Sequence, residues 1–155
     1  MVHKEISIQA RIVAEGECAM GIQYSLPIIP LLSLGDYDGD DTADIAVLRG
    51  RTGLWAIRGL SRIYFGKAGD LTVPGDYLGT GSSSVGIFRP ISGLWAIRDI
   101  TRVYFGNPSD IPVPADYQGQ GTQSIAVFRG LSGLWAVRDL TRIYFGGAED
   151  QPVSR

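Results

Sequence analysis

The sequence predicts an all-β protein made of three copies of one unit, arranged like blades of a β-propeller. Three observations support this prediction. A 40-residue repeat spans most of the chain, the residues of each repeat favour strands over helices, and both faces of the predicted sheets are apolar. We define the repeats as unit 1 (31–70), unit 2 (71–110) and unit 3 (111–150).

The period is clearest in the phrase Gly-Leu-Trp-Ala, which occurs at 53–56, 93–96 and 133–136. Units 2 and 3 are identical at 22 of 40 positions, and many of their differences exchange Ile, Val and Leu. All three Trp residues and fourteen of the fifteen aromatic residues fall inside the units. The repeat therefore accounts for all the tryptophans and nearly all the aromatic residues of the chain.

Each unit is predicted to form a small antiparallel sheet of four strands. In unit 2, residues of high β-propensity occupy 71–74, 85–89, 94–98 and 102–105, with Gly or Pro near each junction. A Ser-Gly or Thr-Gly pair precedes the third strand of every unit, which predicts a tight hairpin with glycine at positive φ.

Both faces of these sheets are expected to be covered. Trp95 and Ile97 lie on one face and Leu94 and Ala96 on the other, and neither set is polar. Such a sheet must pack between two neighbours, as propeller blades do. Small residues recur where a neighbour's aromatic ring would need room: Ala46, Gly86 and Ala126, and Ala56, Ala96 and Ala136. We expect the Trp residues to pack in the core, with ligand stacking as the alternative: Trp55, Trp95 and Trp135.

Composition argues against several functions. With one Cys and one His, the chain has little material for catalysis by either residue type, and no catalytic motif is recognised, so we predict no enzyme. The net charge of −2 lacks the basic excess of nucleic-acid binding. No apolar stretch reaches the roughly 20 residues of a membrane span.

The residues outside the units are predicted to contribute little regular structure. In 1–30, apolar and polar residues alternate over 6–14, which predicts one strand, and 15–30 are irregular. No signal-peptide pattern is recognised in 1–30. The sequence of 151–155 matches the start of a further strand.

An acidic loop in unit 1 is the strongest chemical motif. Carboxylates at Asp36, Asp38, Asp40 and Asp44, with a backbone carbonyl at Thr42, form the oxygen set that Ca²⁺ prefers. A solvated acidic turn is the alternative interpretation.

The loop differs from an EF-hand, because Asp41 replaces the usual Gly at position 6 and Val47 replaces Glu at position 12. Units 2 and 3 keep one carboxylate each of the set, Asp76 and Asp116, together with the turn glycines. We therefore expect an architectural loop in all units and metal binding in unit 1 alone.

The run Gly-Asp-Tyr-Asp-Gly-Asp-x-x-x-Asp-Ile-Ala-Val, at 35–47, resembles the calcium-loop repeat of FG-GAP/VCBS proteins, which build integrin-like β-propellers. The resemblance covers about 31–150 and is specific in unit 1. It implies one propeller blade per unit, Ca²⁺ at the loop, and a role in protein interaction or surface adhesion without catalysis. It also implies an extracellular or cell-surface location.

Arginines recur in step with the units and offer a second hypothesis. One set could form an anion or sugar site in each unit, as in a lectin: Arg58, Arg98 and Arg138. Aspartates recur as well, at Asp70, Asp110 and Asp150, so the simpler interpretation is a series of exposed Arg–Asp pairs at strand ends.

Three units are fewer than the four blades of the smallest usual propeller. We therefore expect a homo-oligomer that closes one ring. A second route is pairing of the strand 6–14 with the tail at 151–155, and a β-trefoil is the rival pseudo-threefold architecture.

Overall fold

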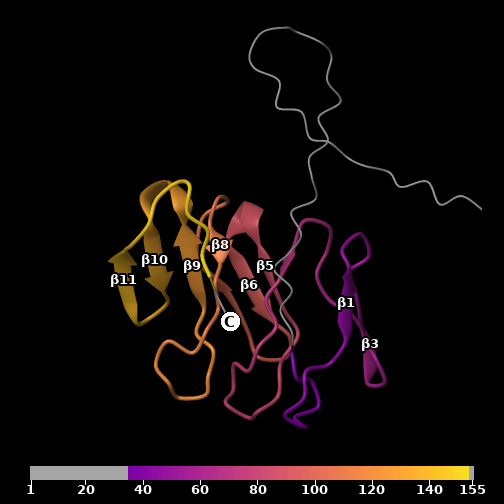
Figure 1. The fold of residues 1–155 in the computed structure, drawn as a ribbon. Coiled ribbons are helices and arrows are strands. Elements are labelled where there is room, and N and C mark those ends of the chain that lie inside the picture. Colours follow the sequence, from indigo (N-terminus) through magenta and orange to yellow (C-terminus); the bar gives the residue numbers. More distant parts are fainter. Residues whose placement is uncertain (1–34, 154–155) are drawn as a thin grey trace, which may run out of the picture.

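The computed structural model describes residues 35–153 of the chain (Figure 1). This part is all-β and contains three separate antiparallel sheets, one in each unit, with no closed sheet and no α-helix among the described residues. The strand predicted at 6–14 and the irregular segment at 15–30 lie outside the described residues.

The strands follow one another in sequence order within every sheet. Sheet 1 contains β1 (Ala46–Arg49), β2 (Leu54–Ile57) and β3 (Ser61–Tyr64). Sheet 2 contains β4 (Leu71–Thr72), β5 (Gly86–Arg89), β6 (Leu94–Ile97) and β7 (Thr101–Tyr104). Sheet 3 contains β8 (Ile111–Pro112), β9 (Ala126–Arg129), β10 (Leu134–Val137) and β11 (Thr141–Tyr144). The prediction of four strands is thus confirmed in units 2 and 3, and three strands lie within the described part of unit 1.

The turn before each third strand takes the predicted glycine conformation. Gly53, Gly93 and Gly133 have φ of 68°, 65° and 65°. In units 2 and 3 the turn also contains a short 3₁₀ helix, at Pro90–Ser92 and Gly130–Ser132. A side chain at Gly93 would collide with the Gly106 carbonyl, so close backbone approach as well as positive φ requires glycine there.

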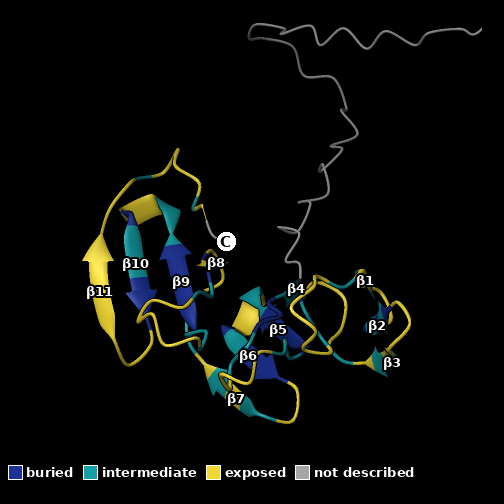
Figure 2. Ribbon diagram, turned by 60° about the horizontal axis from the view of Figure 1, so that its bottom comes forward, coloured by how far each residue is buried: buried dark blue, intermediate teal, exposed yellow. Residues whose placement is uncertain are grey.

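The sheets pack face to face in chain order. We call the face that carries the tryptophan the Trp face and the opposite face, which carries the aligned alanine, the Ala face. From sheet 1, Trp55 and Ile57 pack against Ile87 and Ala96 of sheet 2. Sheet 2 packs its own Trp face against sheet 3 in the same way, and Ala136 lies in that cluster. Figure 2 shows that β5 and β9 are mostly buried, whereas β11, the edge strand of sheet 3, is exposed.

Each tryptophan side chain makes a hydrogen bond to the residue that follows the last strand of its own sheet. Every indole N–H donates to the carbonyl of the phenylalanine ten residues later, at 3.0 Å: Trp55 to Phe65, Trp95 to Phe105, and Trp135 to Phe145. The Trp95 ring also lies 5.2 Å from that of Phe88, in a tilted arrangement. Trp55 and Trp95 are buried. The expected packing role is therefore confirmed for these two residues.

Buried ion pairs join the first two strands of sheets 2 and 3. Asp70 accepts two hydrogen bonds from the Arg89 guanidinium, at 2.8 and 2.9 Å, and Asp110 does the same with Arg129 at 2.7 and 2.9 Å. The Asp110 carboxylate also accepts the Asn107 N–H. The pairs expected to be exposed are thus buried at their carboxylates. Each aspartate lies directly before the first strand of its sheet and pairs with the arginine at the end of the second strand.

Replacing the buried Asp110 by Asn should lower the free energy of unfolding by about 2–4 kcal/mol, because Arg129 loses its bidentate partner in a partly desolvated place. The matched control is Asp139→Asn, which weakens an exposed pair with Arg138 and should cost about 0–1 kcal/mol. Urea unfolding followed by Trp fluorescence measures both. Equal effects would contradict the assignment of the buried pairs as structural.

Candidate metal site and inter-unit groove

The acidic loop lies directly before β1 and is closed at its base by the pairing of Gly35 with Asp44. The equivalent loops of units 2 and 3 close in the same way and lie at the same end of the stack (Figure 1). Backbone hydrogen bonds connect neighbouring loops, from the Ser83 N–H to the Asp36 carbonyl and from the Gln123 N–H to the Asp76 carbonyl. The three loops therefore form one continuous rim.

The first aspartate of each loop holds the loop backbone. In unit 1, the Asp36 carboxylate accepts the N–H groups of Gly39 at 2.6 Å and Asp41 at 2.8 Å. Asp76 accepts the N–H groups of Gly79 and Gly81, and Asp116 accepts those of Gln120 and Gly121. This carboxylate is the one that all three units share, and its role is architectural.

Asp41 adopts the backbone conformation of the glycine that it replaces. Its φ is 64°, compared with 84° and 75° at Gly81 and Gly121, the equivalent residues of units 2 and 3. Aspartate tolerates this left-handed region better than most residues. The departure from the usual calcium-loop pattern therefore leaves the loop path intact.

Hydrogen bonding shifts the titration of these first aspartates. Desolvation raises the pKa of Asp36, but the N–H groups of Gly39, Asp41 and Asp40 outweigh it, so the pKa lies below its ordinary value. The pKa of Asp76 is lowered by the same balance. In Asp116 the hydrogen bond from Gln120 is the largest cause of the lowered pKa.

Three of the five predicted metal ligands come together. The carboxylate oxygens of Asp36, Asp38 and Asp40 lie within 4.8 Å of one another, so this cluster could hold a metal ion. The pKa of Asp38 is raised, first by desolvation and then by the charges of Asp40 and Asp44.

The other two predicted ligand residues make hydrogen bonds within the loop. The Asp44 carboxylate accepts the Tyr37 N–H at 2.7 Å. The Thr42 N–H donates to Asp40 at 2.8 Å. Both residues border the cluster along the loop but are not among the three whose carboxylates converge.

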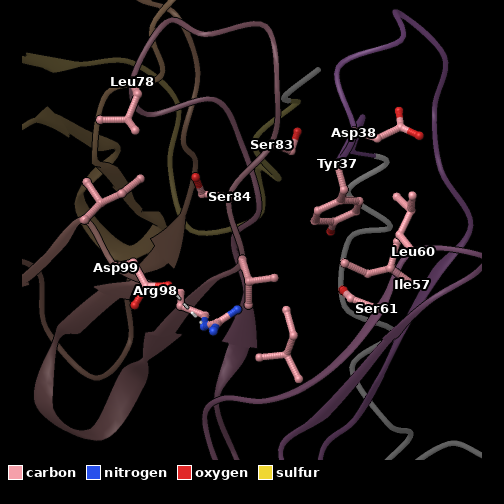
Figure 3. Close-up of a pocket in the computed structure, with 13 residues that line it drawn as sticks. Tyr37, Asp38, Ile57, Leu60, Ser61, Leu78, Ser83, Ser84, Arg98 and Asp99 are labelled. Carbon is pink, nitrogen blue, oxygen red and sulfur yellow. Dashed lines mark ion pairs between the residues drawn. The ribbon is translucent and has the colours of Figure 1, made fainter.

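A groove of about 490 Å³ opens between units 1 and 2, beside the acidic loop (Figure 3). Tyr37 and Asp38 line it from the loop, and Ile57 and Leu60 line it from sheet 1. The opposite wall is the Ala-face side of unit 2, which contributes Arg98. The groove therefore combines an apolar floor with charged groups of both signs at its margin.

The arginines and tryptophans predicted to bind a ligand differ among the units in their partners and in their exposure. Arg98 and Arg138 pair with the aspartate that follows each of them, at 3.4 and 3.3 Å, and both arginines are partly exposed. In unit 1 the following residue is Gly59, so Arg58 has no such neighbour. Of the tryptophans, Trp135 alone is partly exposed.

Sequence reasoning missed a set of exposed aromatic residues. Three tyrosines on the last strands of the sheets are each 75% exposed: Tyr64, Tyr104 and Tyr144. Tyr64 lines a second groove, of about 340 Å³, together with Arg89 and Arg102. The alternation of Arg and Tyr with apolar residues in these strands was the available signal, because alternate residues of a strand point to opposite faces.

Comparisons with known proteins found no matching family model, no matching curated protein and no matching solved structure. Within residues 35–153, no helix is long and apolar enough to cross a bilayer.

Two substitutions should distinguish the carboxylate that holds the loop backbone from a carboxylate that the loop fold does not require. Asp116→Asn should lower the melting temperature by a few degrees at pH 6. Hydrogen bonds hold the pKa of Asp116 below 3.8, so its ionised form stabilises the fold above that pH, and this contribution disappears as the pH falls through the lowered pKa.

Asp38→Asn in calcium-free buffer should raise the melting temperature, because it relieves repulsion from Asp40. Differential scanning calorimetry at pH 6 and pH 3 checks both, and a stabilising Asp116→Asn would refute the architectural role.

Proposed function

We propose that the chain is a non-catalytic binding module of the β-propeller type, related to FG-GAP/VCBS repeats. In this proposal unit 1 binds one Ca²⁺, and the surface beside it serves protein interaction or surface adhesion. The observation that carries the proposal is the convergence of three carboxylates, at Asp36, Asp38 and Asp40, in a loop whose fold requires only the first.

The comparison among the units supports this interpretation. Leu78 and Gln118 stand at the position of Asp38, yet in their loops the first aspartate still accepts the N–H groups at the positions of Asp40 and Asp41. The carboxylates of Asp38 and Asp40 are therefore not needed for the loop path. Held close together, they repel each other and Asp36, and a hard cation with oxygen ligands would offset that repulsion. The Thr42 carbonyl and Asp44 complete the proposed ligand set.

The stacked sheets support the propeller assignment. Sheet 2 buries one face against sheet 1 and the other against sheet 3, in sequence order, which is the arrangement of a propeller blade. Since Asp38 belongs to the metal cluster and also lines the groove between units 1 and 2, bound Ca²⁺ would order one wall of that groove. The groove's apolar floor and its Arg98 suit a protein segment with apolar and acidic side chains.

Calcium should bind with a stoichiometry of one per chain, measured by isothermal titration calorimetry, and should raise the melting temperature, with EGTA reversing the shift. The double variant Asp38→Asn, Asp40→Asn should lose this binding, because only the architectural Asp36 remains in the cluster. The matched control, Asp116→Asn in the equivalent loop of unit 3, should keep it. An unchanged melting temperature on adding EGTA to the intact chain would overturn the metal proposal.

A lectin is the second candidate, favoured by the exposed tyrosines that recur once in each unit. Aromatic faces beside arginines suit sugar rings, and weak sites repeated three times add by multivalency. Tyr104→Ala should then reduce glycan-array binding, while Leu131→Ala, an exposed apolar residue in a turn, should not. An array without signal for the intact chain would exclude this candidate in favour of the protein-binding module.

A further inference from the structure

The second groove, of about 340 Å³, which we call the arginine groove, also lies between units 1 and 2. Unit 1 contributes Tyr64, Phe65 and Gly66, and unit 2 contributes part of the Ala face of its sheet. The guanidinium groups of Arg89 and Arg102 line the groove, and among the residues that the structure describes no carboxylate does so. The groove therefore attracts anions, although the chain as a whole has a net charge of −2.

The register of sheet 2 places an apolar floor beside both arginines. Arg89 lies opposite Leu94. Arg102 lies opposite Ala96, and Ala96 lies opposite Ile87 on its other side. Residues directly opposite each other in a sheet point to the same face, so the three apolar side chains and the two arginines share one surface.

Asp70 holds the Arg89 guanidinium in a fixed position. Nε and Nη2 of Arg89 donate to the two oxygens of that carboxylate, at 2.8 and 2.9 Å. The Arg89 side chain is still 25% exposed, whereas the Asp70 side chain is 1% exposed. Within residues 35–153, Nη1 of Arg89 donates no hydrogen bond. An arginine held in this way can bind an anion with little further loss of side-chain entropy.

Arg102 supplies the net positive charge of the groove. It lies in β7, the edge strand of sheet 2, and is exposed. The ion pairs found within residues 35–153 do not include it. Since Asp70 neutralises Arg89, one positive charge remains, which suits a ligand that brings a single negative charge to the groove.

The same groups recur where unit 2 meets unit 3. On the Ala face of sheet 3, Arg129 lies opposite Leu134, and Arg142 lies opposite Ala136. The Asp110 carboxylate holds Arg129 through two hydrogen bonds, at 2.7 and 2.9 Å. The second junction therefore has one arginine fixed by a buried carboxylate and one exposed arginine on the edge strand.

The preceding unit approaches both faces in the same way. A Cβ on Gly66 of unit 1 would lie 3.1 Å from the Ile87 side chain of sheet 2. A Cβ on Gly106 of unit 2 would lie 3.0 Å from the Val127 side chain of sheet 3. Two equivalent junctions of the chain therefore present the same pair of arginines, and a ligand with a repeating charged group can contact both.

We propose that each junction binds one anionic group of an acidic polysaccharide. The two arginines bind the anion, and the apolar floor contacts the C–H face of the sugar ring. A polymer with a repeating charge matches repeated identical sites, whose weak affinities add by multivalency. Nucleic acid suits the sites less well, because its dense phosphates require a larger basic excess. The inference deepens the lectin candidate, on which it rests, and is independent of calcium binding.

Two forms of one polymer test the charge. Polygalacturonate carries a carboxylate on its sugar residues, whereas its methyl ester is the neutral form of the same chain. In EGTA, which removes any contribution from calcium, the protein should bind the acid at least about tenfold more tightly than the ester. Bio-layer interferometry on the immobilised polymers measures both. Dextran sulfate, with neutral dextran as its control, tests a sulfate in the same way, and the more tightly bound acidic polymer identifies the anion.

Substitutions test the site. Arg102→Ala and Arg142→Ala should each weaken binding of the acidic polymer, and the double variant should weaken it at least about tenfold. Arg102→Lys should restore part of the loss, because it keeps the charge without the planar fork. Arg51→Ala is the matched control, since it removes an exposed arginine from a turn outside both grooves, and it should bind as the wild type does. All four variants should keep the wild-type melting temperature.

Binding of neither acidic polymer, or equal binding of each acidic polymer and its neutral control, would overturn the proposal. The same holds if Arg51→Ala and Arg102→Ala lose equal affinity. Poly(glutamate) bound as tightly as polygalacturonate would overturn the assignment to a sugar, since charge alone would then suffice. Neutral glycans bound on the array, without binding of either acidic polymer, would leave the lectin candidate intact and remove only this inference.

Discussion

The packing of each Trp face on the Ala face of the following sheet is the constraint on which the rest of the structure depends. Strands of four residues or fewer form sheets too small to enclose an indole ring by themselves. Trp95 is buried in a cluster that includes Phe88 of its own sheet and Ala136 of sheet 3. Alanine is required at that contact, since a larger residue would hold the sheets apart.

This stacking explains why the loops can differ in chemistry while the fold stays the same. The sheets stand in register, so their loops meet at one rim and share backbone hydrogen bonds from one unit to the next. Within each loop a single aspartate satisfies the backbone N–H groups. The loop fold therefore does not require carboxylates at positions 38 and 40. In unit 1 these positions carry the additional carboxylates that suit a cation.

The repeat made much of the fold predictable. Strand positions in unit 2, positive φ at Gly93 and burial of Trp95 all follow from local propensity, glycine chemistry and apolar character on both faces. The sequence predicted that Arg and Asp residues would pair at strand ends, but it did not predict that the carboxylates would be buried. Their environment depends on which strand lies innermost, and Asp110 and Arg129 are 19 residues apart in sequence.

The sequence by itself determined the unit, its strands, its turns and the acidic residues of one loop, because these depend on neighbouring residues and on a period that repeats. Only the tertiary structure decided which side chains converge. It brought Asp36, Asp38 and Asp40 together while giving Asp44 a backbone partner, and it formed the groove from two units. It also left Tyr64 exposed. These outcomes depend on the register of strands and on the stacking of sheets, which residues distant in sequence fix together.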